Sequence, residues 1–199
     1  MTWTELSALL VFATAMAFTP GPNTTLSAAL AANHGLRRAL RFVIAVPFGW
    51  GLLLLACTFG LGALLQAQPL LRGAVKWFGL AYMLWLAWQL WRATRLAVAD
   101  PQRLAVGFGQ GVALQFVNVK AWMNALLISA GWITVVSPPW PRLAVVLPLM
   151  MLYGFASNFA YALVGSTLRG WLAQGRRLQG FNRSLSGVLV ATAGWMAWM

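Results

Sequence analysis

One interrupted apolar run decides the fold: residues 6–32 read LSALLVFATAMAFTPGPNTTLSAALAA. A helix needs about 20 apolar residues to cross the hydrocarbon core of a bilayer, so this run is long enough for one span. Thr19-Pro20-Gly21-Pro22-Asn23 lies inside the run, and its two prolines remove two backbone donors and clash with the preceding turn. We therefore expect a transmembrane helix that is broken near mid-membrane.

The composition of the whole chain agrees with a membrane location. Of its 199 residues, 61% are hydrophobic and only 8% are charged. A soluble domain carries roughly 25% charged residues. We predict an all-α integral membrane protein with six transmembrane helices in a single domain, residues 1–199. The six runs that predict these helices are Leu6–Ala32, Leu40–Leu65, Leu70–Trp91, Val106–Val136, Leu143–Leu168 and Phe181–Met199.

The positive charges predict how the chain is oriented. The formal net charge is +12, and the cations lie in short clusters between the apolar runs, which argues against nucleic-acid binding. Three cations belong to the even-numbered loops, namely Arg72, Lys76 and Arg142. The odd-numbered loops hold ten, namely Arg37, Arg38, Arg41, Arg92, Arg95, Arg103, Arg169, Arg176, Arg177 and Arg183. The positive-inside rule then predicts that loops one, three and five are cytoplasmic and that both termini are outside.

The predicted helices divide into two groups of three. An odd number of spans per half predicts two repeats of opposite orientation, about 1–95 and 104–199, which is a common architecture in secondary transporters. A second interruption, Asn118-Val119-Lys120, lies in the fourth run at a depth that matches the break in the first. Both breaks are therefore expected near the middle of the bilayer.

The first break predicts one side of a binding site. Asn23 is a good N-cap for the half-helix that follows, and Thr24 comes next. The positive end of such a half-helix, inside the bundle, attracts an anionic group such as a substrate carboxylate. The alternative interpretation is a packing kink without a ligand, because kinked helices are ordinary in membranes.

Lys120 predicts the other side of the site. A lysine at the centre of a membrane helix costs about 2.5–3.5 kcal/mol on insertion scales, so an intramembrane cation is a functional candidate. Glu5 and Asp100 lie outside the expected membrane core, so we expect carbonyls at the first break or the substrate carboxylate to be its partner. The alternative is that its side chain extends to the membrane interface.

Amides complete the expected substrate site. Asn118 and Asn158 are included in it, whereas Gln115 and Asn124 are interpreted as amides that hold helices together. The expected substrate-binding residues are Pro20, Gly21, Pro22, Asn23, Thr24, Asn118, Lys120 and Asn158.

Several kinds of chemistry are not predicted. One histidine (His34), one cysteine (Cys57) and two acids are too few for an ordinary metal site. The sequence has no catalytic triad, no carboxylate pair and no phosphate-binding glycine loop with a lysine. We therefore predict no catalytic, cofactor or metal site, and we expect a gradient or the membrane potential to supply the energy for transport.

Motifs along the whole chain resemble the LysE/RhtB family of amino-acid exporters. They are Pro20-Gly21-Pro22-Asn23, Gly35-Leu36-Arg37-Arg38-Ala39, Lys76-Trp77-Phe78-Gly79-Leu80-Ala81-Tyr82 with Leu84-Trp85-Leu86-Ala87-Trp88, Phe108 to Asn118-Val119-Lys120-Ala121, and Ser184-Leu185-Ser186-Gly187-Val188-Leu189. The resemblance implies six helices in a bacterial inner membrane and export of amino acids or related metabolites by the proton motive force. Val119 stands where the family usually has proline, so we expect the second break to be shallow.

The leading hypothesis is a secondary exporter of a neutral amino acid or a derivative. The scarcity of acids disfavours a strongly cationic substrate, and Lys120 and Glu5 are the candidates for carrying protons. The alternatives are a non-transporting membrane scaffold or assembly partner and a metal or inorganic-ion exporter. The expected partners are a small-molecule substrate and the lipid bilayer. The small-residue pair Gly107 and Gly111 suits either a homodimer or contacts inside the bundle.

Overall fold

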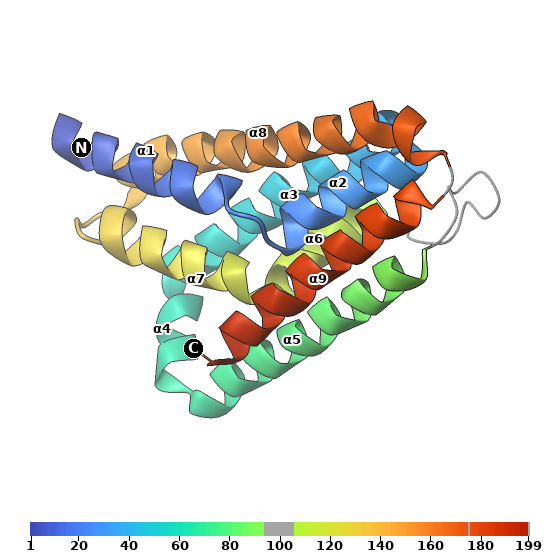
Figure 1. Cartoon of the computed structure of the whole chain (residues 1–199). Coiled ribbons are helices and arrows are strands. Elements are labelled where there is room, and N and C mark those ends of the chain that lie inside the picture. Colours follow the sequence, from blue (N-terminus) through green and yellow to red (C-terminus); the bar gives the residue numbers. More distant parts are fainter. Residues whose placement is uncertain (94–105, 175, 199) are drawn as a thin grey trace.

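The computed structural model describes residues 1–93, 106–174 and 176–198, and it is helical almost throughout (Figure 1). Arg95, Asp100 and Arg103 lie outside the described residues. Within the described residues, the six predicted segments are helical except at the two predicted breaks and at both ends of the fourth segment. The elements, in chain order, are α1 (Trp3–Phe18), α2 (Pro22–His34), α3 (Leu36–Ala56), the π-helical segment η1 (Cys57–Leu61), α4 (Gly62–Ala67), α5 (Pro69–Arg92), α6 (Phe108–Val117), α7 (Val119–Ile128), the π-helical segment η2 (Ser129–Ile133), α8 (Trp140–Leu172) and α9 (Arg177–Trp198).

Two continuous helices are long and apolar enough to cross a membrane, namely Leu36–Leu64 with 29 residues and α8 with 33 residues. Two bent pairs reach the same length and hydropathy together: α1 with α2, bent by 49°, and α6 with α7 and η2, bent by 71°. Helices α5 and α9 are 24 and 22 residues long. The described residues thus form an all-helical bundle with membrane-length elements, two of which are broken where the sequence predicts.

The second break is sharper than predicted. The expectation of a shallow bend at Val119 is wrong, because the 71° bend exceeds that at the proline-containing break. Side chains stabilise it without a proline: Asn118 Oδ1 accepts a hydrogen bond from the Lys120 backbone N–H at 3.1 Å. Trp122 Nε1 donates to the freed Phe116 carbonyl at 2.8 Å. Since the freed backbone groups have partners, the break is tolerated inside the bundle.

The helices pack around α8 and α3. Helix α8 runs along both α2 and α3, α6 packs on α3, and α5 pairs with α9, as Figure 1 shows. Gly111 of α6 lies so close to α3 that a Cβ on it would be 2.7 Å from Ala45 Cβ. Gly111 is therefore used in packing inside the bundle, whereas a homodimer stays a prediction.

The outer surface of the bundle is apolar. Trp3, Leu70 and Trp198 are 86%, 89% and 95% exposed, and many other large apolar side chains are exposed along the helices. A water-facing surface of this kind would associate or aggregate, whereas a bilayer solvates it. The exposed face is the one expected of a protein surrounded by lipid.

Candidate functional site

The first helix break is held open by specific hydrogen bonds. Between α1 and α2, the Phe18 carbonyl accepts a bond from the Tyr161 hydroxyl of α8 at 2.9 Å. The Thr19 carbonyl accepts one from Lys120 Nζ at 2.7 Å. On the other side of the break, the Gly21 N–H donates to Thr24 Oγ1 at 3.0 Å. Each of these bonds gives a partner to a backbone group that the break frees, and in a membrane such groups must find their partners inside the protein.

The start of α2 differs from the prediction that Asn23 caps it. Helix α2 begins at Pro22, and Gly21 is the N-cap residue. Proline suits the first helical position because it has no N–H to leave unpaired there, so the helix starts two residues earlier than expected. Asn23 instead forms a reciprocal amide pair with Gln115 of α6, with N···O distances of 2.8 and 3.1 Å. This residue therefore joins the two broken helices and does not cap its own.

Lys120 connects the two breaks. It lies in the first turn of α7, and its half-buried side chain reaches the Thr19 carbonyl of the other broken helix. The expectation that a carbonyl at the first break would be a partner of this lysine is confirmed, because the Thr19 carbonyl accepts its hydrogen bond. Gly21 makes room for it: a Cβ there would lie 3.0 Å from Lys120 Cδ and 3.2 Å from Nζ.

A cavity of about 90 Å³ lies beside this lysine. It is large enough for several water molecules or a small metabolite, since one water needs about 10–15 Å³ measured in this way. Seven of the eight predicted site residues line it, namely Gly21, Pro22, Asn23, Thr24, Asn118, Lys120 and Asn158. Pro20 is not among the lining residues and contributes only to the backbone break. The cavity also touches the two largest clusters of buried apolar side chains in the described residues, one through Val46 and the other through Met150.

Most amides around the cavity are already bonded within the protein. Asn158 Oδ1 accepts a hydrogen bond from Ser27 at 2.9 Å, and its Nδ2 donates to the Gly154 carbonyl at 2.8 Å. Asn118 caps α7, and Asn23 is paired with Gln115. These side chains position α2, α6, α7 and α8 around the cavity.

Asn124 is a lining residue that the sequence analysis placed outside the site. It lies on α7 one helical turn after Lys120, and it is one of the residues that line the same cavity. Its Oδ1 is buried and has no hydrogen-bond partner within the described ranges. The four-residue spacing from Lys120 is the sequence signal that could have identified it, because residues i and i+4 share one face of a helix.

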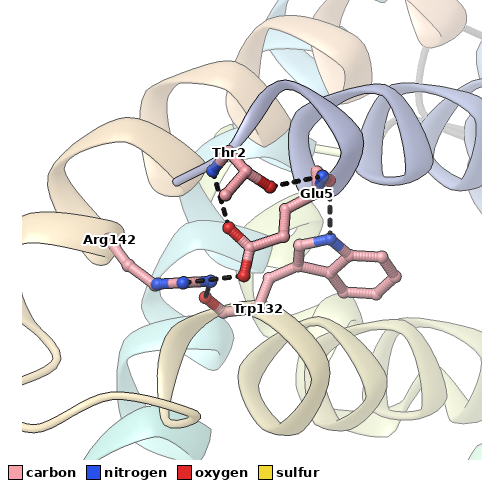
Figure 2. Close-up of polar contacts among 4 residues, drawn as sticks. All are labelled: Thr2, Glu5, Trp132 and Arg142. Carbon is pink, nitrogen blue, oxygen red and sulfur yellow. Dashed lines mark hydrogen bonds and ion pairs between the residues drawn. The ribbon is translucent and has the colours of Figure 1, made fainter.

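A separate polar cluster lies at the N-terminal end of α1, away from the cavity lining (Figure 2). Glu5 Oε1 pairs with Arg142 Nη2 at 2.8 Å, and Glu5 Oε2 accepts from the Thr2 backbone N–H at 2.7 Å. Arg142 also donates to the Trp132 carbonyl at 3.3 Å, and Trp132 Nε1 donates to the Glu5 carbonyl at 3.0 Å. The cluster joins α1, η2 and α8 at one end of the bundle.

Groups of metal-ligand side chains are absent from the part of the chain that the structure describes: no three His, Cys, Asp or Glu residues lie together there. The polar chemistry beside the cavity consists of amides, hydroxyls, backbone carbonyls and one lysine. Such groups can bind and orient a small polar molecule.

Membrane-length helices that are broken beside an internal cavity are typical of multi-pass membrane transporters, because irregular backbone at membrane depth is tolerated where it is buried in protein or lines a cavity. The chain belongs to the LysE type translocator family, whose model matches residues 14–198. This result confirms the predicted family. The protein is thus a multi-pass inner-membrane translocator and not an enzyme.

Its relatives are similar over nearly their whole length. The cysteine/O-acetylserine efflux protein of Klebsiella pneumoniae subsp. pneumoniae is 34% identical over 196 residues, which cover 97% of each chain. The proteins of that name from Salmonella typhimurium and Escherichia coli O1:K1 are 32% and 31% identical over 180 residues, 89% of this chain and 91% of theirs. No solved structure matches the chain.

Proposed function

We propose that this protein is a secondary exporter of small neutral amino acids and their derivatives, with cysteine and O-acetylserine as the first substrates to test. Three relatives with 31–34% identity carry the name cysteine/O-acetylserine efflux protein. The cavity is small, about 90 Å³, which suits substrates of this size. No acidic side chain lines it among the residues that the structure covers, so a cationic side chain would find no partner there.

The observation that carries the proposal is the position of Lys120 between the two breaks. An ammonium group has three donors, and the Thr19 carbonyl occupies one of them. Within the described ranges the other two donors have no protein partner, so they are available to a substrate carboxylate in the adjoining cavity. The N-terminal end of α2 lies at the same cavity and adds the positive end of a helix dipole.

Purified protein in proteoliposomes tests this assignment. We expect Lys120→Ala to abolish flux of labelled L-cysteine and O-acetylserine while the protein still inserts and elutes as a folded species. Lys76→Ala removes a lysine from α5 that does not line the cavity, and it should transport like the wild type. Wild-type flux by the Lys120→Ala variant would exclude this lysine from substrate binding.

For energy coupling we propose the proton motive force. The sequence has no nucleotide-binding glycine loop with a lysine, so a gradient must supply the energy. Flux against a concentration gradient should stop when an ionophore dissipates the proton gradient and the membrane potential. Continued accumulation after that treatment would contradict proton coupling.

We further propose six spans in two inverted repeats, with loops one, three and five in the cytoplasm. Support comes from one end of the bundle, where arginines stack on tryptophans as expected at a charged membrane interface. These pairs are Arg92 on Trp88, Arg177 on Trp171 and Arg183 on Trp91, each 4.8 Å from guanidinium carbon to ring centroid. Impermeant thiol reagents applied to single-cysteine variants, in a Cys57→Ser background, would test which loops are outside.

A further inference from the structure

We propose that Asn124 recognises the α-ammonium group of the substrate, beside Lys120, which holds the carboxylate. This inference rests on the proposed function, and it narrows the substrate class to α-amino acids that keep a free amino group. Carboxylates of the same size without that group would be poor substrates.

The spacing of the two residues fits the two charges of an α-amino acid. Lys120 and Asn124 both belong to α7 and both line the cavity. Residues four apart on a helix have Cβ atoms about 5–6 Å from each other and lie on one face. A carboxylate bound to the lysine therefore places the ammonium group, which is attached to the neighbouring carbon, within reach of the amide.

The hydrogen bonds of the other asparagines that line the cavity also indicate Asn124. The carbonyl oxygens of Asn23, Asn118 and Asn158 accept hydrogen bonds from Gln115, the Lys120 backbone and Ser27. In the described part of the chain, Asn124 is the lining asparagine whose oxygen accepts no such bond. Amide oxygens are good acceptors for an ammonium group, and among the described asparagines that line the cavity this is the one that the protein leaves unused.

The unpaired oxygen of Asn124 needs an explanation of its own. Native proteins satisfy the large majority of their buried polar atoms, because an unpaired one loses its hydration without a replacement. A substrate ammonium supplies the missing donor once the amide turns toward the cavity. The bond would be charge-assisted, and such bonds are stronger than those between neutral groups.

A matched pair of small molecules separates this role from a structural one. L-Cysteine and 3-mercaptopropionate share a thiol and a carboxylate, but only cysteine carries the ammonium group. In proteoliposomes under reducing conditions, the KM of labelled cysteine and the inhibition constant of 3-mercaptopropionate would be measured for the full-length protein. We expect Asn124→Leu to raise the KM for cysteine by about ten- to a hundredfold, as the loss of a hydrogen bond to a charged group does, and to leave the constant for 3-mercaptopropionate nearly unchanged.

Two further variants keep the test decisive. Asn124→Ala, which removes the amide without adding apolar bulk, should likewise raise the KM for cysteine and leave the inhibition constant of 3-mercaptopropionate nearly unchanged. Gln110→Leu removes an exposed amide that binds the Gly107 N–H at the start of α6, and both constants should stay at wild-type values. Equal changes for both molecules, or an unchanged KM for cysteine, would overturn the role of Asn124. Absence of flux in the wild type for both cysteine and O-acetylserine would instead overturn the proposed function.

Discussion

The contact between α8 and α2 predicts a large effect from adding one methyl group. A Cβ at Gly165 would lie 2.2 Å from the Ala28 carbonyl oxygen and 2.9 Å from its carbon. Carbon and oxygen in contact normally stay about 3.3 Å apart, so Gly165→Ala must push the two helices apart by about 1 Å. The atoms that it meets belong to the backbone, so no change of rotamer relieves the clash. Overpacking of this kind lowers the free energy of unfolding by about 1–3 kcal/mol. Alanine has a better helix propensity than glycine, which offsets up to about 1 kcal/mol of that loss.

Gly170→Ala on the same helix is the matched control, since its added Cβ would meet nothing within 4 Å. Thermal unfolding in detergent, followed by the fluorescence of the 12 tryptophans, measures both variants. With the full offset, the net loss is up to about 2 kcal/mol, which corresponds to a Tm lower by up to roughly 8 °C for a chain of this size. Transport should fall as well, because α2 carries one side of the cavity. A Gly165→Ala protein that melts at or above the Gly170→Ala protein would refute the reasoning.

Two other predictions concern the polar clusters away from the cavity. Glu5→Arg and Arg142→Glu should each lower the Tm and the transport rate, because each variant places two like charges together. The double variant, which exchanges the two charges, should recover most of the Tm and of the transport rate. If it recovers neither, the ion pair is not what holds α1 to α8. Asn33→Leu and Asn182→Leu should each cost about 1–3 kcal/mol, since each leaves the buried amide oxygen of the other residue without its donor. In a double-mutant cycle, the loss in the double variant should be well below the sum of the two single losses. Additive losses in that cycle, measured by thermal unfolding, would contradict a direct amide pair.

The long helices could be predicted from the sequence because the bilayer sets their length and composition. Runs of about 20 apolar residues have few other uses, so the predicted segments coincide with helices within a few residues. Helix α9 begins at Arg177, before the predicted Phe181, because polar residues at the membrane surface continue a helix without an apolar signal. The π-helical segments η1 and η2 left no trace in the hydropathy pattern.

The candidate site was predictable only in part. A lysine and a proline pair inside apolar runs are rare enough to identify the two breaks, and Lys120 does reach the first break. The partners of the amides could not be predicted, since the pair of Asn23 and Gln115 joins residues that are 92 positions apart. Helical periodicity shows which residues share a face, but it does not show which other helix that face meets.

A comparison of the two breaks indicates what allows a membrane helix to bend. Hydrogen-bond partners for the freed backbone groups matter more than the type of residue that interrupts the helix. The first break contains two prolines and bends by 49°, whereas the second contains none and bends by 71°. At the second break, Asn118 and Trp122 supply the partners that the freed backbone requires. At the first break, Lys120 of α7 supplies such a partner by donating a hydrogen bond to the Thr19 carbonyl. The residue proposed to bind the substrate therefore also stabilises the backbone irregularity that forms the cavity, so the geometry of the site and the bend of α1 and α2 depend on the same side chain.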